Sequence, residues 1–313
     1  MFAFLNQVAR FGLIGLLFAG AILVTHSYFY FYLCEKGLKM PQDVDTLVLG
    51  HSHAERGVNP ALFPGCKNVA QSNEGYDINA LKLRLFLKRN PGHIKRVILS
   101  VAYHSFWGLS KGGETSGEAI TDAAWDSEKK RRYAYLNYSE TLRKPGWNWR
   151  LLRQNWLLPT KGTLRTMIKY LVGDRYWTDG LPFMGGYQRS YSSMLTPQML
   201  EASLVLYSSP SHHVLNYASL EHVQSIMDEC ARNNVVAELV FFPVHPDYQA
   251  GIPVEYEKDL KKTLGKMAEK QGGKLHDFTS FKVLSEQFQD HTHLNAFGSD
   301  TFTPFLTRAI GHD

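Results

Sequence analysis

The sequence predicts an α/β fold, in which helices cover both faces of a parallel sheet, preceded by one transmembrane helix. Two observations predict it. Short apolar runs alternate with amphipathic segments, and an uncharged apolar stretch lies near the start of the chain. The 313 residues suffice for one sizeable core. A composition of 44% hydrophobic and 20% charged residues is typical of a globular protein and argues against disorder.

The stretch at 11–33, FGLIGLLFAGAILVTHSYFYFYL, contains no Asp, Glu, Lys or Arg. As a helix it would be about 34 Å long, enough to cross a hydrocarbon core of roughly 30 Å. Five aromatic residues, 28–32, lie at one end, where a membrane interface favours aromatic rings. We therefore expect an uncleaved anchor rather than a signal peptide, between a short segment at 1–10 and a polar linker at 34–43.

The apolar runs predict buried strands at 44–49, 94–101 and 235–242, with shorter strands at 68–70 and 274–278. Helical spacing of apolar residues predicts helices at 78–88, 220–232, 255–271 and 297–310. Ligands of such sheets bind beyond the carboxyl ends of the strands. The loops expected to carry function are therefore 50–53, 72–75, 103–105 and 243–247, together with the segment before the last helix.

The alternation breaks between about residues 105 and 215, inside a domain that we expect to span 44–313. All six tryptophans, Trp107 to Trp177, lie in this stretch. We interpret it as an insertion over the strand ends that binds sugar, the bilayer surface or a membrane partner. A helical subdomain with its own small core is the alternative.

Charge and cysteine content exclude some classes of protein. The net charge of +5 is mild, and no basic run with interleaved aromatics is present, so we expect no nucleic-acid partner. The three cysteines, Cys34, Cys66 and Cys230, form no C-x-x-C pair and indicate neither a zinc ribbon nor a disulfide framework. Pairing of Cys66 with Cys230 remains open, and we expect no cofactor.

Two distant segments hold the candidate chemistry. Ser52, in Leu49-Gly50-His51-Ser52-His53, follows a predicted strand and a glycine. Asp290 and His293 lie three positions apart near the carboxy terminus, a spacing that places them on one side of the chain. Alone, such a serine is often a helix cap, and such a pair is often a solvated loop. Together they supply a nucleophile, a base and a carboxylate, if the hydroxyl and the imidazole lie about 2.6–3.2 Å apart.

The stretches LVLGHSHAERGVNPALFP, KNVAQSNEGYD and HDFTSFKVLSEQFQDHTHLNAFG resemble the SGNH (GDSL-like) hydrolase superfamily. The similarity is closest to membrane-tethered members such as alginate O-acetylation and lipoteichoic-acid D-alanylation proteins. It covers both ends of 44–300 but not the middle. The resemblance implies a three-layer, flavodoxin-like fold, with Ser52 as nucleophile, His293 as base and Asp290 as its carboxylate.

The resemblance also implies an oxyanion hole, for which this sequence departs from the family pattern. The usual G-D-S reads with His51 at its middle position, and the third-block G-x-N-D is missing. The expected donors are the backbone N–H of Ser52, Asn73 or Gly75 of the second block, and His104 as substitute for the missing asparagine. Losing one such donor typically costs about 2.7–4 kcal/mol in the transition state.

The expected function is that of a serine esterase or O-acyltransferase acting on cell-envelope or exopolysaccharide glycan through an acyl-enzyme. The resemblance implies a domain outside the cytoplasm, periplasmic or at the cell surface, and a multi-pass membrane acyltransferase as partner. The charges flanking the anchor do not decide its orientation, because Arg10 precedes it and Glu35, Lys36 and Lys39 follow it. The acyl group, the acceptor and the choice between hydrolysis and transfer stay open.

Two other functions remain as alternatives. One is a metal-dependent hydrolase, because two loops supply five potential ligands: His51, His53, Asp290, His291 and His293. The other is a catalytically degenerate fold of the same family that binds glycan or serves as scaffold for a membrane acyltransferase.

Overall fold

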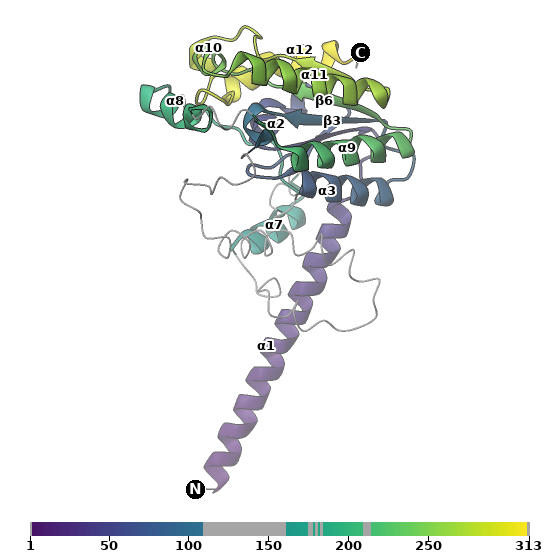
Figure 1. Cartoon of the computed structure of the whole chain (residues 1–313). Helices are drawn as coiled ribbons and strands as arrows, with labels where there is room; N and C mark the ends of the chain where they lie inside the picture. The colour runs from purple at the N-terminus through teal and green to yellow at the C-terminus, as the bar shows by residue number, and fades with distance from the viewer. Residues whose placement is uncertain are drawn as a thin grey trace. The chain divides into compact units, whose positions relative to one another are not determined.

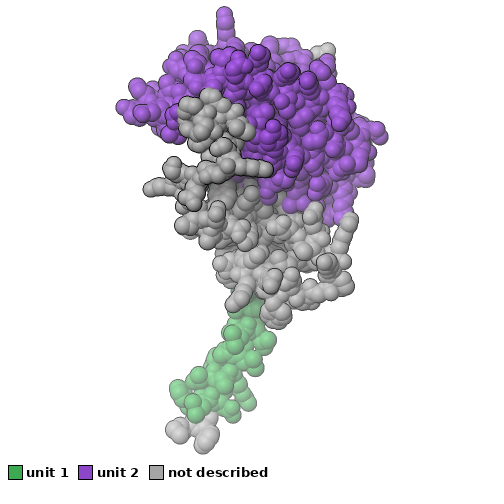
Figure 2. All heavy atoms as spheres, in the orientation of Figure 1, with its two compact units in different colours: residues 1–38, 120–183 green, residues 39–119, 184–313 purple. Residues whose placement is uncertain are grey.

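The structure is a computed structural model that describes residues 2–108, 161–174, 178, 181, 184–208 and 214–311. The chain forms two compact units, coloured separately in Figure 2. One comprises residues 1–38 and 120–183, and the other comprises residues 39–119 and 184–313. Of the tryptophans in the predicted insertion, only Trp107 lies within the described residues, so the interpretation of that segment as an insertion over the strand ends falls largely outside them.

The first unit is dominated by α1 (Phe2–Gly37), the long helix of Figure 1. Its stretch Phe4–His26 has a mean hydropathy of 2.1, is not buried, and is long and apolar enough to cross a membrane. The helix begins before the expected anchor at 11–33 and extends past it. Arg10 is the only Asp, Glu, Lys or Arg in the first 34 residues, and one charge does not end a helix. In the same unit, Lys36 of α1 donates to the hydroxyl of Tyr170 in α7 (Lys161–Leu171) at 2.7 Å.

The second unit is built on a parallel five-stranded sheet in the order β2-β1-β3-β6-β7. Its strands are β1 (Thr46–Leu49), β2 (Cys66–Asn68), β3 (Arg96–Val101), β6 (Val236–Phe241) and β7 (Lys274–Asp277). The strand expected at 68–70 is shifted. It ends at Asn68, whose side-chain amide turns away to donate to the carbonyls of Ala54 and Val58. The parallel sheet predicted from the sequence is confirmed.

Helices flank both faces of this sheet (Figure 1). On one face lie α3 (Tyr76–Arg89), α9 (Tyr217–Arg232) and α11 (Val254–Lys270), which contact one another in that order. On the other face α2 (Ser52–Gly57) packs against α12 (Ala296–Ala309). There Val48, Ile98 and Val240 of the sheet form one core with Phe302 and Leu306 of α12. The alternating side chains of each strand thus serve both layers.

Shorter elements complete the described part of this unit. These are α8 (Pro197–Leu204), α10 (Pro246–Ala250), the antiparallel pair β4 (Trp107–Gly108) and β5 (Val214–Leu215), and 3-10 turns at Pro60–Leu62, Tyr103–Phe106, Val205–Tyr207 and Ser285–Gln287. All three cysteines are buried and free, so the pairing of Cys66 with Cys230 left open by the sequence is not formed.

The strand order reverses between β1 and β3. From β1 the chain moves to β2 on one side, and after α3 it enters β3 on the other side. Helices that leave in opposite directions open a crevice at the carboxyl ends of the two central strands. Ser52 follows β1 and His104 follows β3, so the fold places both at this crevice.

Candidate functional site

The turn between β1 and α2 requires glycine at its first position. Gly50 has φ of +128°, and a Cβ there would lie 2.5 Å from Cβ of Ser100. The amide of Gly50 donates to Oδ1 of Asn79 at 2.7 Å, and its carbonyl accepts from the amide of Gln71 at 3.1 Å. This fixed turn makes Ser52 the first residue of α2.

Asn79 is a positioning residue that sequence analysis missed. It is fully buried in α3, and besides accepting from Gly50 it donates to the carbonyl of Gly75 at 2.9 Å. One side chain therefore ties the turn of the serine to the turn that precedes α3. Its only signal in the sequence was a polar residue on the apolar face of the helix predicted at 78–88.

The loop carrying Asp290 and His293 is fixed to the start of α12. Asn295 caps this helix, accepting from the amides of Phe297 and Gly298 at 3.0 and 3.1 Å. The amide of Gln289 donates to the carbonyl of His293 at 2.8 Å and closes the loop on itself. Satisfied backbone groups at both ends hold the loop in one conformation.

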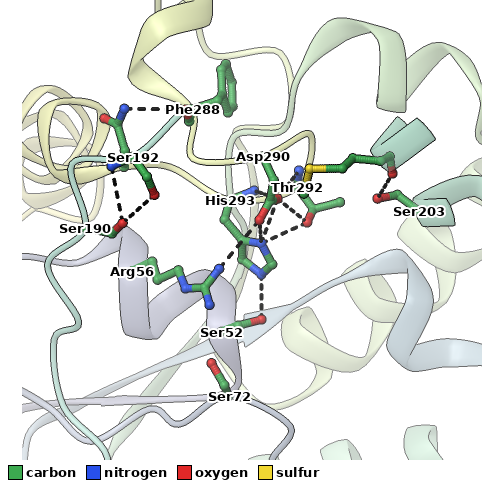
Figure 3. Close-up of polar contacts among 12 residues, drawn as sticks. Ser52, Arg56, Ser72, Ser190, Ser192, Ser203, Phe288, Asp290, Thr292 and His293 are labelled. Atoms are coloured by element: carbon green, nitrogen blue, oxygen red, sulfur yellow. Dashed lines mark hydrogen bonds and ion pairs between the residues drawn. The ribbon is translucent and has the colours of Figure 1, made fainter. Parts of the chain in front are cut away.

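The structure brings Ser52, His293 and Asp290 together (Figure 3). Nε2 of His293 lies 2.7 Å from Oγ of Ser52, within the separation that the sequence analysis required. Nδ1 of the same ring lies 2.8 and 2.9 Å from the two carboxylate oxygens of Asp290. A hydroxyl therefore faces an imidazole that a carboxylate orients.

Asp290 is held as the charged carboxylate. Burial acts to raise its pKa, but the hydrogen bond and charge of His293, with the amide and hydroxyl of Thr292 at 2.9 Å, lower that pKa to about 2. An ionised carboxylate opposite Nδ1 of His293 requires the proton on Nδ1, which leaves Nε2 free to accept from Ser52.

Two contributors to this arrangement were not predicted. Thr292 holds Asp290 through two hydrogen bonds, and Nη1 of Arg56 lies 3.6 Å from Oδ2 of Asp290. Arg56 follows Ser52 by four positions, the spacing that places two helical residues on one side. That spacing was the available signal for Arg56, whereas Thr292 had none beyond its place in the loop.

Searches among known proteins gave no match. No family model matches the chain, and no curated protein matches it. The chemistry of the site is therefore inferred from its geometry.

Four histidine rings gather beside Ser52. The ring of His53 lies 5.0 Å from those of His51 and His293, and 5.5 Å from that of His104, between ring centroids. Burial, followed by the charge of neighbouring histidines, holds the pKa values of His51 and His53 well below the usual range. Both rings are thus neutral at pH 7, and each keeps one donor and one acceptor nitrogen.

Several of these nitrogens have no partner among the described residues. They are Nδ1 and Nε2 of His51 and Nε2 of His53, all buried. Buried polar atoms are normally hydrogen-bonded, so such atoms beside a nucleophile indicate a place where a polar ligand binds.

Of the residues expected to form the oxyanion hole, some lie beside the histidine cluster and others do not. His104 joins the ring cluster, 5.2 Å from His51, whereas Asn73 is exposed with φ of +60°. No hydrogen bond among the described residues joins Asn73 or Gly75 to Ser52. The Ser52 amide lies in the first turn of α2, where a helix provides no acceptor for it. The second-block loop is nevertheless tied to α2, because the amide and hydroxyl of Ser72 donate to the carboxylate of Glu55.

The five residues of the metal alternative do not converge on one point. Asp290 and His293 bond to each other, and His291 instead packs its ring against His245, with centroids 5.3 Å apart. Within the described part of the chain, the group whose ligand atoms all lie within 4.8 Å of one another is His245, Asp247 and His291.

Proposed function

We propose that this protein is a membrane-anchored serine esterase or O-acyltransferase of the SGNH type. One observation carries the proposal: Ser52 is hydrogen-bonded to Nε2 of His293, whose Nδ1 faces the ionised Asp290. The sheet order supports a flavodoxin-like fold, because its strands in chain order give 2-1-3-4-5. The site at the β1/β3 reversal is the place where such folds bind ligands.

The chemistry follows from the positions of the three side chains. His293 takes the proton of Ser52 as the hydroxyl oxygen attacks an acyl carbonyl, and Asp290 stabilises the imidazolium that forms. The tetrahedral intermediate collapses when His293 returns the proton to the departing alcohol oxygen, leaving an acyl-serine. Water or a sugar hydroxyl then attacks this ester with His293 again as base, giving hydrolysis or transfer.

The neutral histidines support the base in this mechanism. Positive charge on His53, whose ring lies 5.0 Å from that of His293, or on the neighbouring His51 would oppose protonation of His293 during attack. Because burial keeps both uncharged, the developing imidazolium meets no like charge from them. We assign the oxyanion to the Ser52 amide and to an imidazole N–H of this cluster, His104 or His53, in place of the asparagine that the family uses.

The substrate class follows from the anchor and the resemblance. The apolar helix α1 supports attachment of the site to a bilayer, and the resemblance to membrane-tethered SGNH proteins suggests a glycan as substrate. We therefore propose glycan O-acylation or deacylation outside the cytoplasm, with a multi-pass membrane acyltransferase as acyl donor where the reaction is transfer.

Ser52→Ala in the detergent-solubilised full chain, assayed with p-nitrophenyl acetate, tests the proposal. Removal of the nucleophile predicts a loss of at least 10³-fold in kcat, as for other serine enzymes. Ser203→Ala is the matched control, because that hydroxyl donates to the carbonyl of Met199 within its own helix, and it retains full activity. Unchanged turnover in Ser52→Ala, with a native circular dichroism spectrum, would instead remove Ser52 from the mechanism.

A further inference from the structure

Behind the proposed catalytic loop lies a second group of side chains that the esterase mechanism does not use. His245 lies between β6 and α10 as the N-cap of α10, and Asp247 lies in the first turn of α10. His291 comes from the loop between β7 and α12. The amide of His245 donates to the carbonyl of His291 at 3.0 Å, so the two segments are joined at this point.

The three side chains offer ligand atoms of the right kind and spacing for a transition metal. Their nitrogen and oxygen atoms all lie within 4.8 Å of one another. Two imidazoles and one carboxylate bind Zn²⁺ at about 2.0–2.2 Å, which places ligand atoms of a tetrahedral site roughly 3.4 Å apart. The Asp247 side chain is 64% exposed, so it is free to make the small rotation that brings its carboxylate to bonding distance of the same ion as the two imidazoles.

A second, independent observation indicates a ligand here. His291 is only 4% exposed, and its Nδ1 is buried with no partner among the described residues. A buried ring nitrogen without a partner is rare in a folded protein and calls for an unseen water or ion. His245 is almost as buried. Its Nδ1 accepts from the amide of Asp247 at 3.3 Å and lies 3.5 Å from the carboxylate of the same residue, so metal binding at Nδ1 exchanges this amide hydrogen bond for coordination.

We propose that His245, Asp247 and His291 bind one divalent transition-metal ion, with zinc as the best match to two imidazoles and a carboxylate. Water completes the coordination on the exposed side of Asp247. The ion has a structural task, because His291 lies between Asp290 and Thr292. Binding clamps the loop of the proposed base against the end of β6, and the clamp is a positioning device rather than a participant in acyl transfer.

Metal binding is measured without reference to activity, so its failure and that of the proposed function are distinguishable. The full chain in detergent is stripped with EDTA, dialysed, and titrated with Zn²⁺ by calorimetry, and bound zinc is counted by elemental analysis. The expected result is one zinc per chain. Asp247→Asn, a conservative change of an exposed side chain, raises the dissociation constant for zinc at least tenfold. His291→Gln abolishes stoichiometric zinc binding.

Two further variants test whether zinc binding is specific to His245, Asp247 and His291. His222→Asn changes an exposed histidine of α9 and leaves zinc affinity unchanged. His53→Gln removes a histidine of the cluster beside Ser52 and also leaves it unchanged. Fewer than 0.2 zinc per chain at 100 μM free zinc would overturn the proposal. So would undiminished binding in both Asp247→Asn and His291→Gln, or loss of binding in His53→Gln alone, which would move the site to the other histidines.

Discussion

The hydroxyl oxygen of Ser52 lies 2.7 Å from Nε2 of His293, although 241 positions separate the two residues. Packing of α2 against α12 brings them together. The hydroxyl of Thr303 in α12 donates to the carbonyl of Gly57 at 3.2 Å and accepts from the amide of Asn59 at 3.0 Å. These buried bonds fix the end of α2 to α12, so the residues at the starts of the two helices keep their mutual position.

Asp290→Asn keeps the shape of the site and removes its charge. An amide no longer selects the tautomer of His293 with its proton on Nδ1, so we expect kcat to fall about 10³–10⁴-fold. Circular dichroism stays native. Asp259→Asn, an exposed carboxylate of α11, is the control and retains wild-type turnover. A loss smaller than tenfold for Asp290→Asn would remove the carboxylate from the mechanism.

Gly50→Ala tests the turn that carries Ser52. The added Cβ meets Cβ of Ser100 at 2.5 Å in a backbone conformation with φ of +128°. Backbone strain and overpacking each cost about 1–3 kcal/mol, so urea unfolding should show a loss of about 2–6 kcal/mol. Gly92→Ala is the matched control. Gly92 has φ of +70° but open space around it, so this variant loses only the free energy of backbone strain. Equal losses in the two variants would contradict the close approach to Ser100.

The buried histidines predict how stability depends on pH. The folded-state pKa values of His51 and His53 lie well below that of an unfolded histidine, about 6.5, so below that pH the unfolded chain binds more protons. Their contribution is complete above pH 6.5 and is lost as pH falls. Burial likewise lowers the pKa of His104 to about 4, and the three groups together predict a loss of about 3 kcal/mol between pH 6 and pH 5. The lowered pKa of Asp290, near 2, acts only at more acidic pH.

His53→Gln isolates this effect from that of the carboxylates. The slope of unfolding free energy against pH, measured by urea denaturation between pH 7 and pH 5, should fall by about one third of the contribution of His51, His53 and His104. His222→Asn, whose ring is exposed, should leave the slope as in the wild type. A slope identical in His53→Gln and wild type would show that folding leaves the pKa of His53 unshifted.

Sequence patterns predicted those parts of the molecule that depend on residues close together in the chain. The apolar runs that became β1, β3 and β6 were recognisable because a central strand buries both faces. Asp290 and His293 were recognisable as a pair because three positions separate them. The hydrogen bonds of Asn79 to Gly50 and the approach of His245 to His291 were not, because each joins segments that only the folded sheet brings together.

The central claim is that Ser52 forms a covalent acyl intermediate. Intact-mass spectrometry of the full chain, quenched in acid after brief reaction with an acyl ester or a fluorophosphonate, measures this directly. We predict one adduct per chain, mapped to the peptide containing Ser52, absent from Ser52→Ala and strongly reduced in Asp290→Asn. An adduct on another residue, or equal labelling of Ser52→Ala, would contradict the account.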